Sequence, residues 1–474
     1  MLGWAASGGM ALTGRADGAP AASPAPAFGL LSAVVAELAA VTRVTGVEVR
    51  ADPGELLAGR AAVAGFRRRG RVSAGGSARL LRAADGWCAV NLSRADDVGA
   101  VPAIIGLLGV PGVPGVPGVA GVAGVAGVAG AGAEGVWGAL EAAALGTQAA
   151  ALAGAAQLLG VPAGALPSEL PVDGLPVDGL RGLARGGGWR AGRASRIAAP
   201  FAGARLAGAL VVDLSSMWAG PLCARLLGLA GADVIKVETP DRPDGGRAGE
   251  RRFFDWLHGG HRSVVLDFRS PSGRDALAAL LAVADVVIEA SRPRALAQLG
   301  LAPEMIPHPD GQVWLSITGY GRGEPAAAEL VAFGDDAAVA GGLVGWAGDG
   351  LGDVGGWNDG EPVFCADAVA DPLTGVCGAL AVARSVAAGG GELIDLSMRE
   401  VAAGFAAAPA VDHGPHSVCL AGGVEGGAGA VVACAALGVE QAVLPPRAPA
   451  VAGVAAAMGA DTGTVLAGLG AGSG

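Results

Sequence analysis

The second half of this sequence predicts an α/β fold, a Rossmann-like doubly wound parallel sheet. Apolar runs of strand length alternate with helical segments after residue 205. That alternation is typical of βαβ units, whose strands lie parallel. The expected strands are 209–216, 233–238, 261–268, 285–290, 312–321 and 392–398. Helices are expected from about Pro221 to Gly231, from the cap Ser272 to 284, over 366–386, and from 399 onward.

Composition limits the class of protein. The chain has 474 residues, of which 52% are hydrophobic and 16% charged, so it can bury a core and is not expected to be disordered. Its net charge of -11 disfavours nucleic-acid binding, which needs a basic face. None of the six cysteines forms a CxxC pair, which favours a reduced, cytoplasmic protein with buried thiols. No metal site is expected.

The first 200 residues contain shorter structural signals. Residues 28–42 have helical spacing, 71–93 predict strands with Asp85-Gly86 as a hairpin turn, and 135–159 predict a helix. Residues 107–133 are uncharged but repeat Gly, Val, Pro and Ala; Pro and Gly disfavour a helix, so a low-complexity loop is expected, not a membrane span. The N-terminus lacks the basic and apolar regions of a signal peptide.

The first strand is not followed by a dinucleotide-binding turn. The fingerprint would need three glycines, but only Gly220 lies in this turn, and Pro221 follows it. No P-loop is present either. Neither an NAD site nor a nucleoside triphosphate site is therefore predicted.

The order of six segments resembles the family III CoA-transferases, also called the CaiB/BaiF family. The segments are 206–238, 261–277, 284–301, 313–325, 362–383 and 389–400. The resemblance implies that 204–400 is a Rossmann-like catalytic domain, accompanied by a small α+β domain. Residues 401–474 would close the fold, because they end in a segment similar to the family's closing P-x-x-G-x-x-T-x-x-V-L-x-x-L-G pattern.

The family's catalytic carboxylate lies in a D-x-x-x-G pattern, which here is Asp371 to Gly375. The resemblance implies that Asp371 attacks a thioester, giving a mixed anhydride and then an aspartyl-CoA thioester. A helix N-terminus is expected to keep Asp371 ionised. The residues alone allow another interpretation, in which Asp371 only caps the helix and Pro372 is its first residue. Asp367 is the alternative nucleophile.

The resemblance also implies a CoA-binding loop after the first strand. It assigns Ser216, Trp218, Ala219 and Gly220 to this loop, although family members often have His and Gln where Ser216 and Trp218 stand here. Lys236 follows the family's I-K-x-E strand and would bind a phosphate. It would otherwise be an exposed lysine at the end of a strand.

Two further segments complete the expected CoA site. Arg292 and Arg294 correspond to the family's R-P-G segment, where a guanidinium suits a CoA phosphate. A solvated turn is the alternative. Gly319 and Tyr320 match the family's G-[YF]-G turn near the active site.

One departure bears on the reaction. The family's racemases carry a His in a G-H-D motif, and the equivalent stretch here has Asp335 after Gly334. A two-base proton exchange would lose its usual partner, so transfer is favoured over racemisation.

The parts of the family pattern occur in an unusual order. A DGW-type strand (84–87) and a G-V-P-A segment (160–163) precede the catalytic domain, whereas the family has them after it. Residues 7–20 resemble the stretch before the catalytic Asp, and the Asp position then falls at Ala25. We therefore expect 1–165 to be a degenerate second copy that supplies the small domain, joined by a linker at 166–203.

The resulting prediction is an acyl-CoA:carboxylate CoA-transferase. Its substrates would be an acyl-CoA and a carboxylic acid acceptor, with no permanently bound cofactor, and family members imply a homodimer. Two alternatives remain: an acyl-CoA racemase or isomerase of the same fold, and a non-catalytic CoA-ester-binding homologue.

Overall fold

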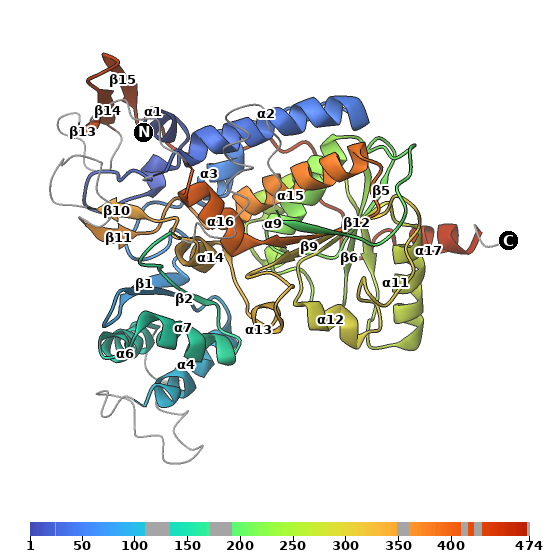
Figure 1. Ribbon diagram of the computed structural model, residues 1–474, viewed down its shortest axis with the longest axis horizontal. Coiled ribbons are helices and arrows are strands. Elements are labelled where there is room, and N and C mark those ends of the chain that lie inside the picture. The colour runs from blue at the N-terminus through green and yellow to red at the C-terminus, as the bar shows by residue number, and fades with distance from the viewer. Residues whose placement is uncertain are drawn as a thin grey trace.

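A computed structural model describes residues 1–23, 25–109, 133–170, 192–347, 360–408, 416–420 and 429–471. Its largest unit is a seven-stranded sheet with the order β4-β12-β9-β8-β5-β6-β7 (Figure 1). The strands are β4 (Arg193–Arg196), β5 (Leu210–Asp213), β6 (Asp233–Glu238), β7 (Arg262–Val265), β8 (Val286–Glu289), β9 (Val313–Thr318) and β12 (Glu392–Ser397). All neighbours pair in parallel except the edge strand β4, which runs antiparallel to β12. This confirms the predicted doubly wound α/β fold and its six expected strands.

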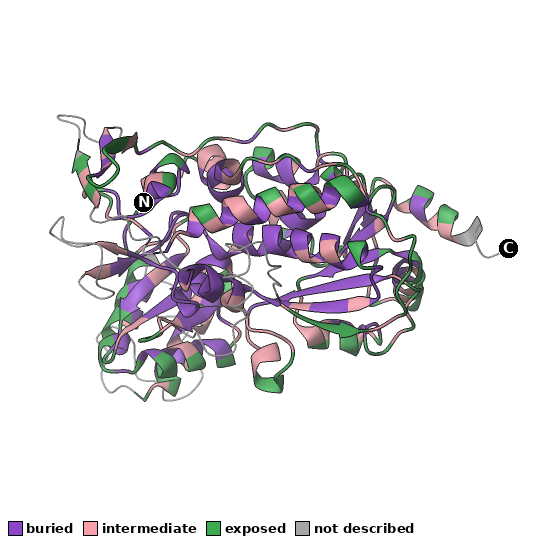
Figure 2. Cartoon of the chain, turned by 45° about the horizontal axis from the view of Figure 1, so that its top comes forward, coloured by how far each residue is buried: buried purple, intermediate pink, exposed green. Residues whose placement is uncertain are grey.

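Both faces of the sheet are covered, as the continuous apolar strands require. Side chains of a strand alternate between two separate cores: Val211 faces one and Val212 the other. Neighbouring strands repeat this alternation, so the strands are buried between two layers of helices (Figure 2).

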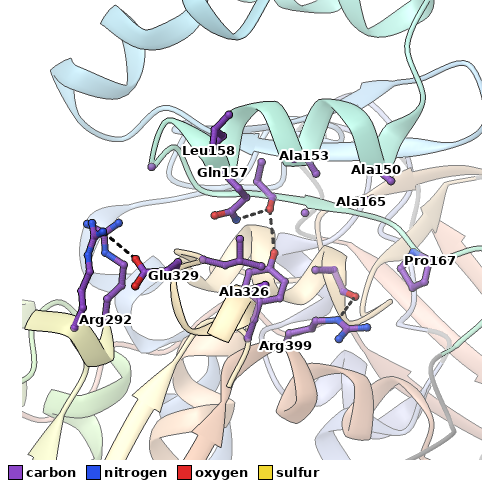
Figure 3. Close-up of a pocket in the computed structure, with 18 residues that line it drawn as sticks. Ala150, Ala153, Gln157, Leu158, Ala165, Pro167, Arg292, Ala326, Glu329 and Arg399 are labelled. Carbon is purple, nitrogen blue, oxygen red and sulfur yellow. Dashed lines mark hydrogen bonds and ion pairs between the residues drawn. The ribbon is translucent and has the colours of Figure 1, made fainter. Parts of the chain in front are cut away.

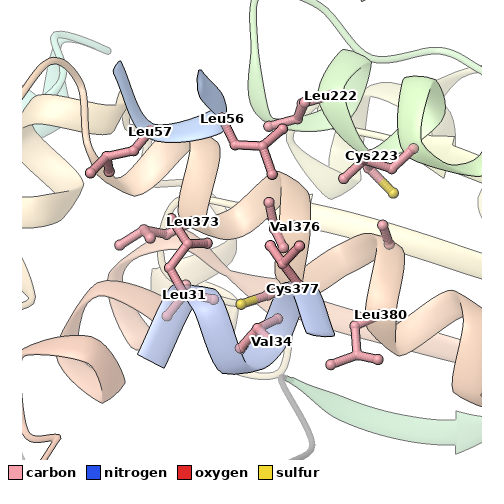
Figure 4. Packing of buried hydrophobic residues seen from close by; sticks show 14 of the residues in the cluster. Leu31, Val34, Leu56, Leu57, Leu222, Cys223, Leu373, Val376, Cys377 and Leu380 are labelled. Carbon is pink, nitrogen blue, oxygen red and sulfur yellow. The ribbon is translucent and has the colours of Figure 1, made fainter. Parts of the chain in front are cut away.

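The first layer contains α9 (Ala219–Leu229), α15 (Ala370–Ala387), α10 (Arg251–His258) and α16 (Met398–Ala406). The predicted helix at 28–42 is present as α2 (Ala27–Thr45) and lies against α15, far from it in sequence (Figure 1). Leu31 and Val34 of α2 pack beside Leu373, Val376 and Cys377 of α15 (Figure 4). The N-terminal region is thus part of the core that supports the large sheet.

The length and composition of α2 would also allow this helix to cross a membrane.

The second layer contains α11 (Pro271–Val283), α12 (Pro293–Gln298) and α17 (Thr462–Ala471). The expected cap of α11 is corrected from Ser272 to Ser270. The Ser270 hydroxyl accepts a hydrogen bond from the Gly273 N–H at 3.0 Å, and Pro271 occupies the first helical position. A cap must precede the first turn whose free N–H groups it satisfies, and Ser272 lies within that turn.

A smaller unit is built from the N-terminal region. Strands β1 (Ala78–Arg82) and β2 (Trp87–Asn91) form the predicted antiparallel hairpin, and β3 (Ala163–Ala165) pairs with β2. Helices α4 (Ala95–Leu107), α6 (Ala133–Leu145) and α7 (Ala149–Leu158) cover this sheet. The single helix expected at 135–159 is therefore two helices, broken at Gly146-Thr147. Most of the expected low-complexity loop and part of the expected linker lie outside the described residues.

Helix α14 (Gly334–Ala340) connects the two units, because it contacts β2 and β3 as well as α15 and α16. Among the remaining elements, one helix has 12 residues and the others have five residues or fewer. They are α1 (Leu2–Ala6), η1 (Met10–Leu12), α3 (Pro53–Ala64), η2 (Gly245–Ala248), α13 (Pro325–Ala328), β10 (Gly345–Ala347), β11 (Glu361–Val363), β13 (His416–Leu420), β14 (Ala430–Cys434) and β15 (Val439–Ala442). All six cysteines are free, and five are buried.

Candidate functional site

Asp371 lies where three elements meet. It is the second residue of α15 and remains partly exposed. Its Oδ2 accepts a hydrogen bond of 3.1 Å from the N–H of Gly334, the first residue of α14. The backbone of Ala219, at the start of α9, is a second hydrogen-bond partner. The alternative role as a helix cap is not seen: the residue at the cap position is Val369, and no side chain caps this helix.

The expected ionisation of Asp371 needs correction. Burial raises the pKa of Asp371 to about 7, against the opposing effects of Arg60 and of the two backbone hydrogen bonds. The helix N-terminus therefore does not outweigh desolvation. Near neutral pH this carboxyl group is poised between its protonated and ionised forms, as suits a group whose charge must change during a reaction.

Two more buried carboxyl groups lie close to Asp371. Asp335 accepts a hydrogen bond of 3.0 Å from the Ala368 N–H, and Asp367 forms an ion pair of 3.1 Å with Arg60. Burial, and next the charge of Asp367, raise the pKa of Asp335 to about 7. We refer to Asp335, Asp367 and Asp371 as the carboxylate cluster. The sequence reasoning had singled out these three residues but missed Arg60, which lies 307 positions before Asp367.

The backbone around Asp367 is strained. Ala366 and Ala368 have φ angles of 56° and 42°, in the left-handed region that non-glycine residues rarely adopt. The Ala366 N–H donates to Thr13 Oγ1 at 3.0 Å, and the Ala368 N–H donates to Asp335. These two contacts hold a conformation that costs free energy, and such conformations concentrate at functional sites.

The loop that precedes α9 is also tightly constrained. Met217 has a φ of 74°, and its N–H donates to Asp244 Oδ1 at 2.9 Å. A Cβ at Gly220 would lie 2.1 Å from Ser215 Oγ, so this position requires glycine. Ser216 is exposed, whereas Trp218 is 2% exposed and packs edge-on against Phe253. Of these predicted CoA-loop residues, Ser216 is therefore open to a ligand and the Trp218 side chain is not.

Lys236 has a different role from either one expected. It is neither an exposed strand end nor open to a phosphate, because its side chain is 2% exposed. Its Nζ lies 2.9 Å from Asp244 Oδ2 and 3.6 Å from Asp213 Oδ2, and it donates a hydrogen bond to the Ser215 carbonyl. Lys236 is thus held by two buried carboxylates beneath the loop that precedes α9. Its hydrogen bond to the Ser215 carbonyl supports the backbone of that loop.

Arg292 and Arg294 line a cavity of about 760 Å³ between the two units (Figure 3). Tyr320, Gln157 and Arg399 are among its other lining residues. Arg294 pairs with Glu329 at 3.0 Å, and the Tyr320 hydroxyl donates to the Ala163 carbonyl at 3.0 Å. Asp371 does not line this cavity: α14 runs from Gly334, beside Asp371, to Ala340 at the cavity wall.

Gly319 does not line the cavity either. Its carbonyl accepts a hydrogen bond of 3.0 Å from the Arg399 N–H. A Cβ there would lie 2.8 Å from the Ala332 Cβ, so the close packing favours glycine. Gly319 thus positions the neighbouring residues Tyr320 and Arg399.

Residues 206–436 match the model of CoA-transferase family III. This region belongs to that family. A succinate–glutarate CoA-transferase of Agrobacterium fabrum is 32% identical over 214 residues, which cover 41% of this chain and 51% of the relative. A formyl-CoA:oxalate CoA-transferase of Rhodopseudomonas palustris is 35% identical over 126 residues, covering 25% and 30%. A solved CaiB/BaiF family protein of Brucella suis is 30% identical with a TM-score of 0.36, covering 44% of this chain and 56% of that one. The chain thus spans about half or less of the curated relatives' length.

Proposed function

We propose that this family III protein is an acyl-CoA:carboxylate CoA-transferase in which Asp371 is the nucleophile. The observation that carries the proposal is the environment of Asp371. A partly exposed carboxyl group accepts hydrogen bonds from two backbone segments at the end of a parallel sheet. The names of the relatives add support, since both enzymes transfer CoA between carboxylic acids.

The proposed reaction begins with attack of the Asp371 carboxylate on the thioester carbonyl of the acyl-CoA. The CoA thiolate leaves, and a mixed anhydride forms between Asp371 and the acyl group. The thiolate then attacks the Asp371 carbonyl, which releases the acyl group as a carboxylate and leaves an aspartyl-CoA thioester. The acceptor carboxylate repeats both steps in reverse, leaving Asp371 free. The N–H groups of Gly334 and Ala219 would stabilise negative charge on the oxygens of Asp371.

The cavity beside α12 suits the phosphate end of CoA. The guanidinium groups of Arg294, Arg242 and Arg94 lie near enough to Arg292 to lower its pKa, after burial, which has the largest effect. Glu329 is the opposing charge in this group. Several arginines close to one another favour the binding of an anionic ligand, which reduces their mutual repulsion. A guanidinium group can bind a phosphate through two parallel hydrogen bonds.

A racemase or isomerase is the second candidate, because Asp335 and Asp371 both have a pKa of about 7 and lie close together. Such a pair can serve as acid and base. Exchange of the α-proton in deuterated water with a single acyl-CoA would identify a racemase. Conversion of a single acyl-CoA without proton exchange and without an acceptor acid would identify an isomerase that transfers CoA within one molecule, whereas a strict need for an acceptor acid identifies a transferase.

Three broader expectations remain predictions. The origin of residues 1–165 as a second copy that supplies the small domain is a hypothesis from the order of the sequence segments, and the packing of α2 along α15 is compatible with it. A homodimer is expected from the family resemblance, and a cytoplasmic location from the six cysteines, none of which forms a CxxC pair. Light scattering on the purified chain measures the oligomeric state directly.

Mass spectrometry tests the proposed nucleophile. The protein is incubated with a panel of acyl-CoAs and acceptor acids, and covalent intermediates are trapped with hydroxylamine or borohydride. A modification on Asp371 is expected in the wild type and in Asp367→Asn, but not in Asp371→Ala. A modification on Asp367 instead would reassign the nucleophile. A folded protein that reacts with no thioester would favour a CoA-ester-binding role.

A further inference from the structure

The carboxylate cluster is completed by a residue of the N-terminal region. Arg60 lies on α3, which begins at Pro53 after the cap Asp52 and contacts both α10 and α15. Its guanidinium lies 5.3 Å from the ring centre of Phe66 and 5.4 Å from that of Trp218. The two aromatic rings restrict the guanidinium and add a favourable cation–π contact. The orientation of Arg60 is therefore well defined.

Arg60 faces carboxyl groups from two different elements. It pairs with Asp367, which precedes α15, at 3.1 Å, and the Asp367 side chain has no exposed surface. Its charge also acts on Asp371 of α15 and on Asp335 of α14. Among the described residues, Arg60 is the cation whose charge opposes the effect of burial on the pKa of all three carboxyl groups. Without Arg60, the two buried carboxyl groups and the partly exposed Asp371 would have no compensating charge from it, which disfavours ionisation of each.

We propose that Arg60, a residue of the N-terminal region that pairs with Asp367, is a positioning residue for the transferase and favours the carboxylate form of Asp371 for attack on the thioester. This inference rests on the proposed function of Asp371 and adds a specific role for residues outside the family match. Arg60 acts through charge and through Asp367, and it does not need to touch the substrate. The region carrying α3 is accordingly part of the active enzyme and not an appendage.

A purely structural role for Arg60 predicts something different. If the ion pair with Asp367 only anchored α3, replacing Arg60 would lower stability but leave the pH dependence of catalysis unchanged. If Arg60 favours the carboxylate form of Asp371, removing its charge raises the pKa of Asp371 further. The acidic limb of the kcat/KM profile then moves to higher pH, by about one unit or more.

The pH dependence of kcat/KM is measured for Arg60→Gln, for Arg60→Lys and for the control Arg67→Gln. Arg67 is exposed and carries the same charge on the same region. The acidic limb is expected to shift upward in Arg60→Gln, less in Arg60→Lys, and not in Arg67→Gln. Equal pH profiles in all folded variants would overturn the proposal.

A second readout does not depend on activity. The carboxyl carbons of aspartate are labelled with ¹³C, the Asp371 signal is assigned by its loss in Asp371→Asn, and its titration is followed in each variant. An upward shift of the Asp371 titration in Arg60→Gln supports the role of Arg60 even if no thioester reacts, and in that case the proposed function alone fails. An unchanged titration in an active enzyme rejects the role of Arg60 and leaves the proposed function standing.

Discussion

Gly334 donates its backbone N–H to the Asp371 carboxylate at 3.1 Å, so the first turns of α14 and α15 meet at this one side chain. A Cβ at Gly334 would lie 2.4 Å from Asp371 Oδ2 and 2.2 Å from the Ala368 carbonyl oxygen. The contact therefore depends on the absence of a side chain at this position.

Substitution of Gly334 by alanine is expected to displace Asp371. The added methyl group overlaps the backbone of Ala368, so the free energy of unfolding should fall by about 1–3 kcal/mol. The kcat should fall as well, because the carboxylate loses its hydrogen-bond donor. Gly138→Ala is the matched control, since nothing lies within 4 Å of a Cβ in that exposed helical position. Normal turnover by Gly334→Ala would contradict the assigned geometry.

The stability of the protein should depend on Asp335 through pH. Burial raises the pKa of Asp335 from 3.8 to about 7, so the folded protein holds this proton more tightly than the unfolded chain. The protonated Asp335 therefore stabilises the folded protein. This stabilisation is fully present below 3.8, the pKa in the unfolded chain, and is lost as the pH rises through about 7, the pKa in the folded protein. Asp335→Asn should therefore be more stable than the wild type at pH 8, by about 1–3 kcal/mol, and equally stable at pH 4. Urea denaturation at the two pH values measures this, and an equal difference at both would refute it.

Lys236→Met is expected to destabilise the fold without a specific loss of CoA affinity. The substitution leaves Asp213 and Asp244 buried without their cation, which costs about 3–5 kcal/mol. Adding Asp244→Asn should recover part of this loss. Chemical denaturation gives the stability, and calorimetric titration with CoA gives the affinity. A large, selective loss of affinity in a stable variant would instead restore the phosphate-binding role of Lys236.

Arg292→Gln is expected to show the opposite pattern. Loss of a charge-assisted contact to a phosphate should weaken CoA binding about tenfold, with little change in stability. Arg50→Gln removes the same charge from a side chain that is 83% exposed and serves as the control. If both variants bind CoA like the wild type, the cavity beside α12 does not hold the phosphates.

The core contact between α2 and α15 predicts that the N-terminal region unfolds together with the large sheet. Leu31 is fully buried in this contact, so Leu31→Ala should lower the free energy of unfolding by about 2–5 kcal/mol. Val44→Ala, on the same helix but 79% exposed, should change it by less than about 0.5 kcal/mol. One cooperative transition is expected by fluorescence and circular dichroism. Two separate transitions would show that the N-terminal region is an independent domain.

Local pattern by itself determined much of the architecture. The strands at 233–238 and 392–398, the hairpin at Asp85-Gly86 and the helix at 28–42 follow from apolar periodicity and turn chemistry, and the structure contains each of them. These signals can be read from sequence because they arise between residues that are close along the chain.

Only the tertiary structure decided which side chains meet and which charges are desolvated. It placed Arg60 against Asp367 across 307 positions and enclosed Lys236 between two carboxylates. It also raised the pKa of Asp371 to about 7, where the sequence alone predicted an ionised group. Ionisation depends on burial and on charges contributed by distant elements, and neither quantity is present in the local pattern of residues.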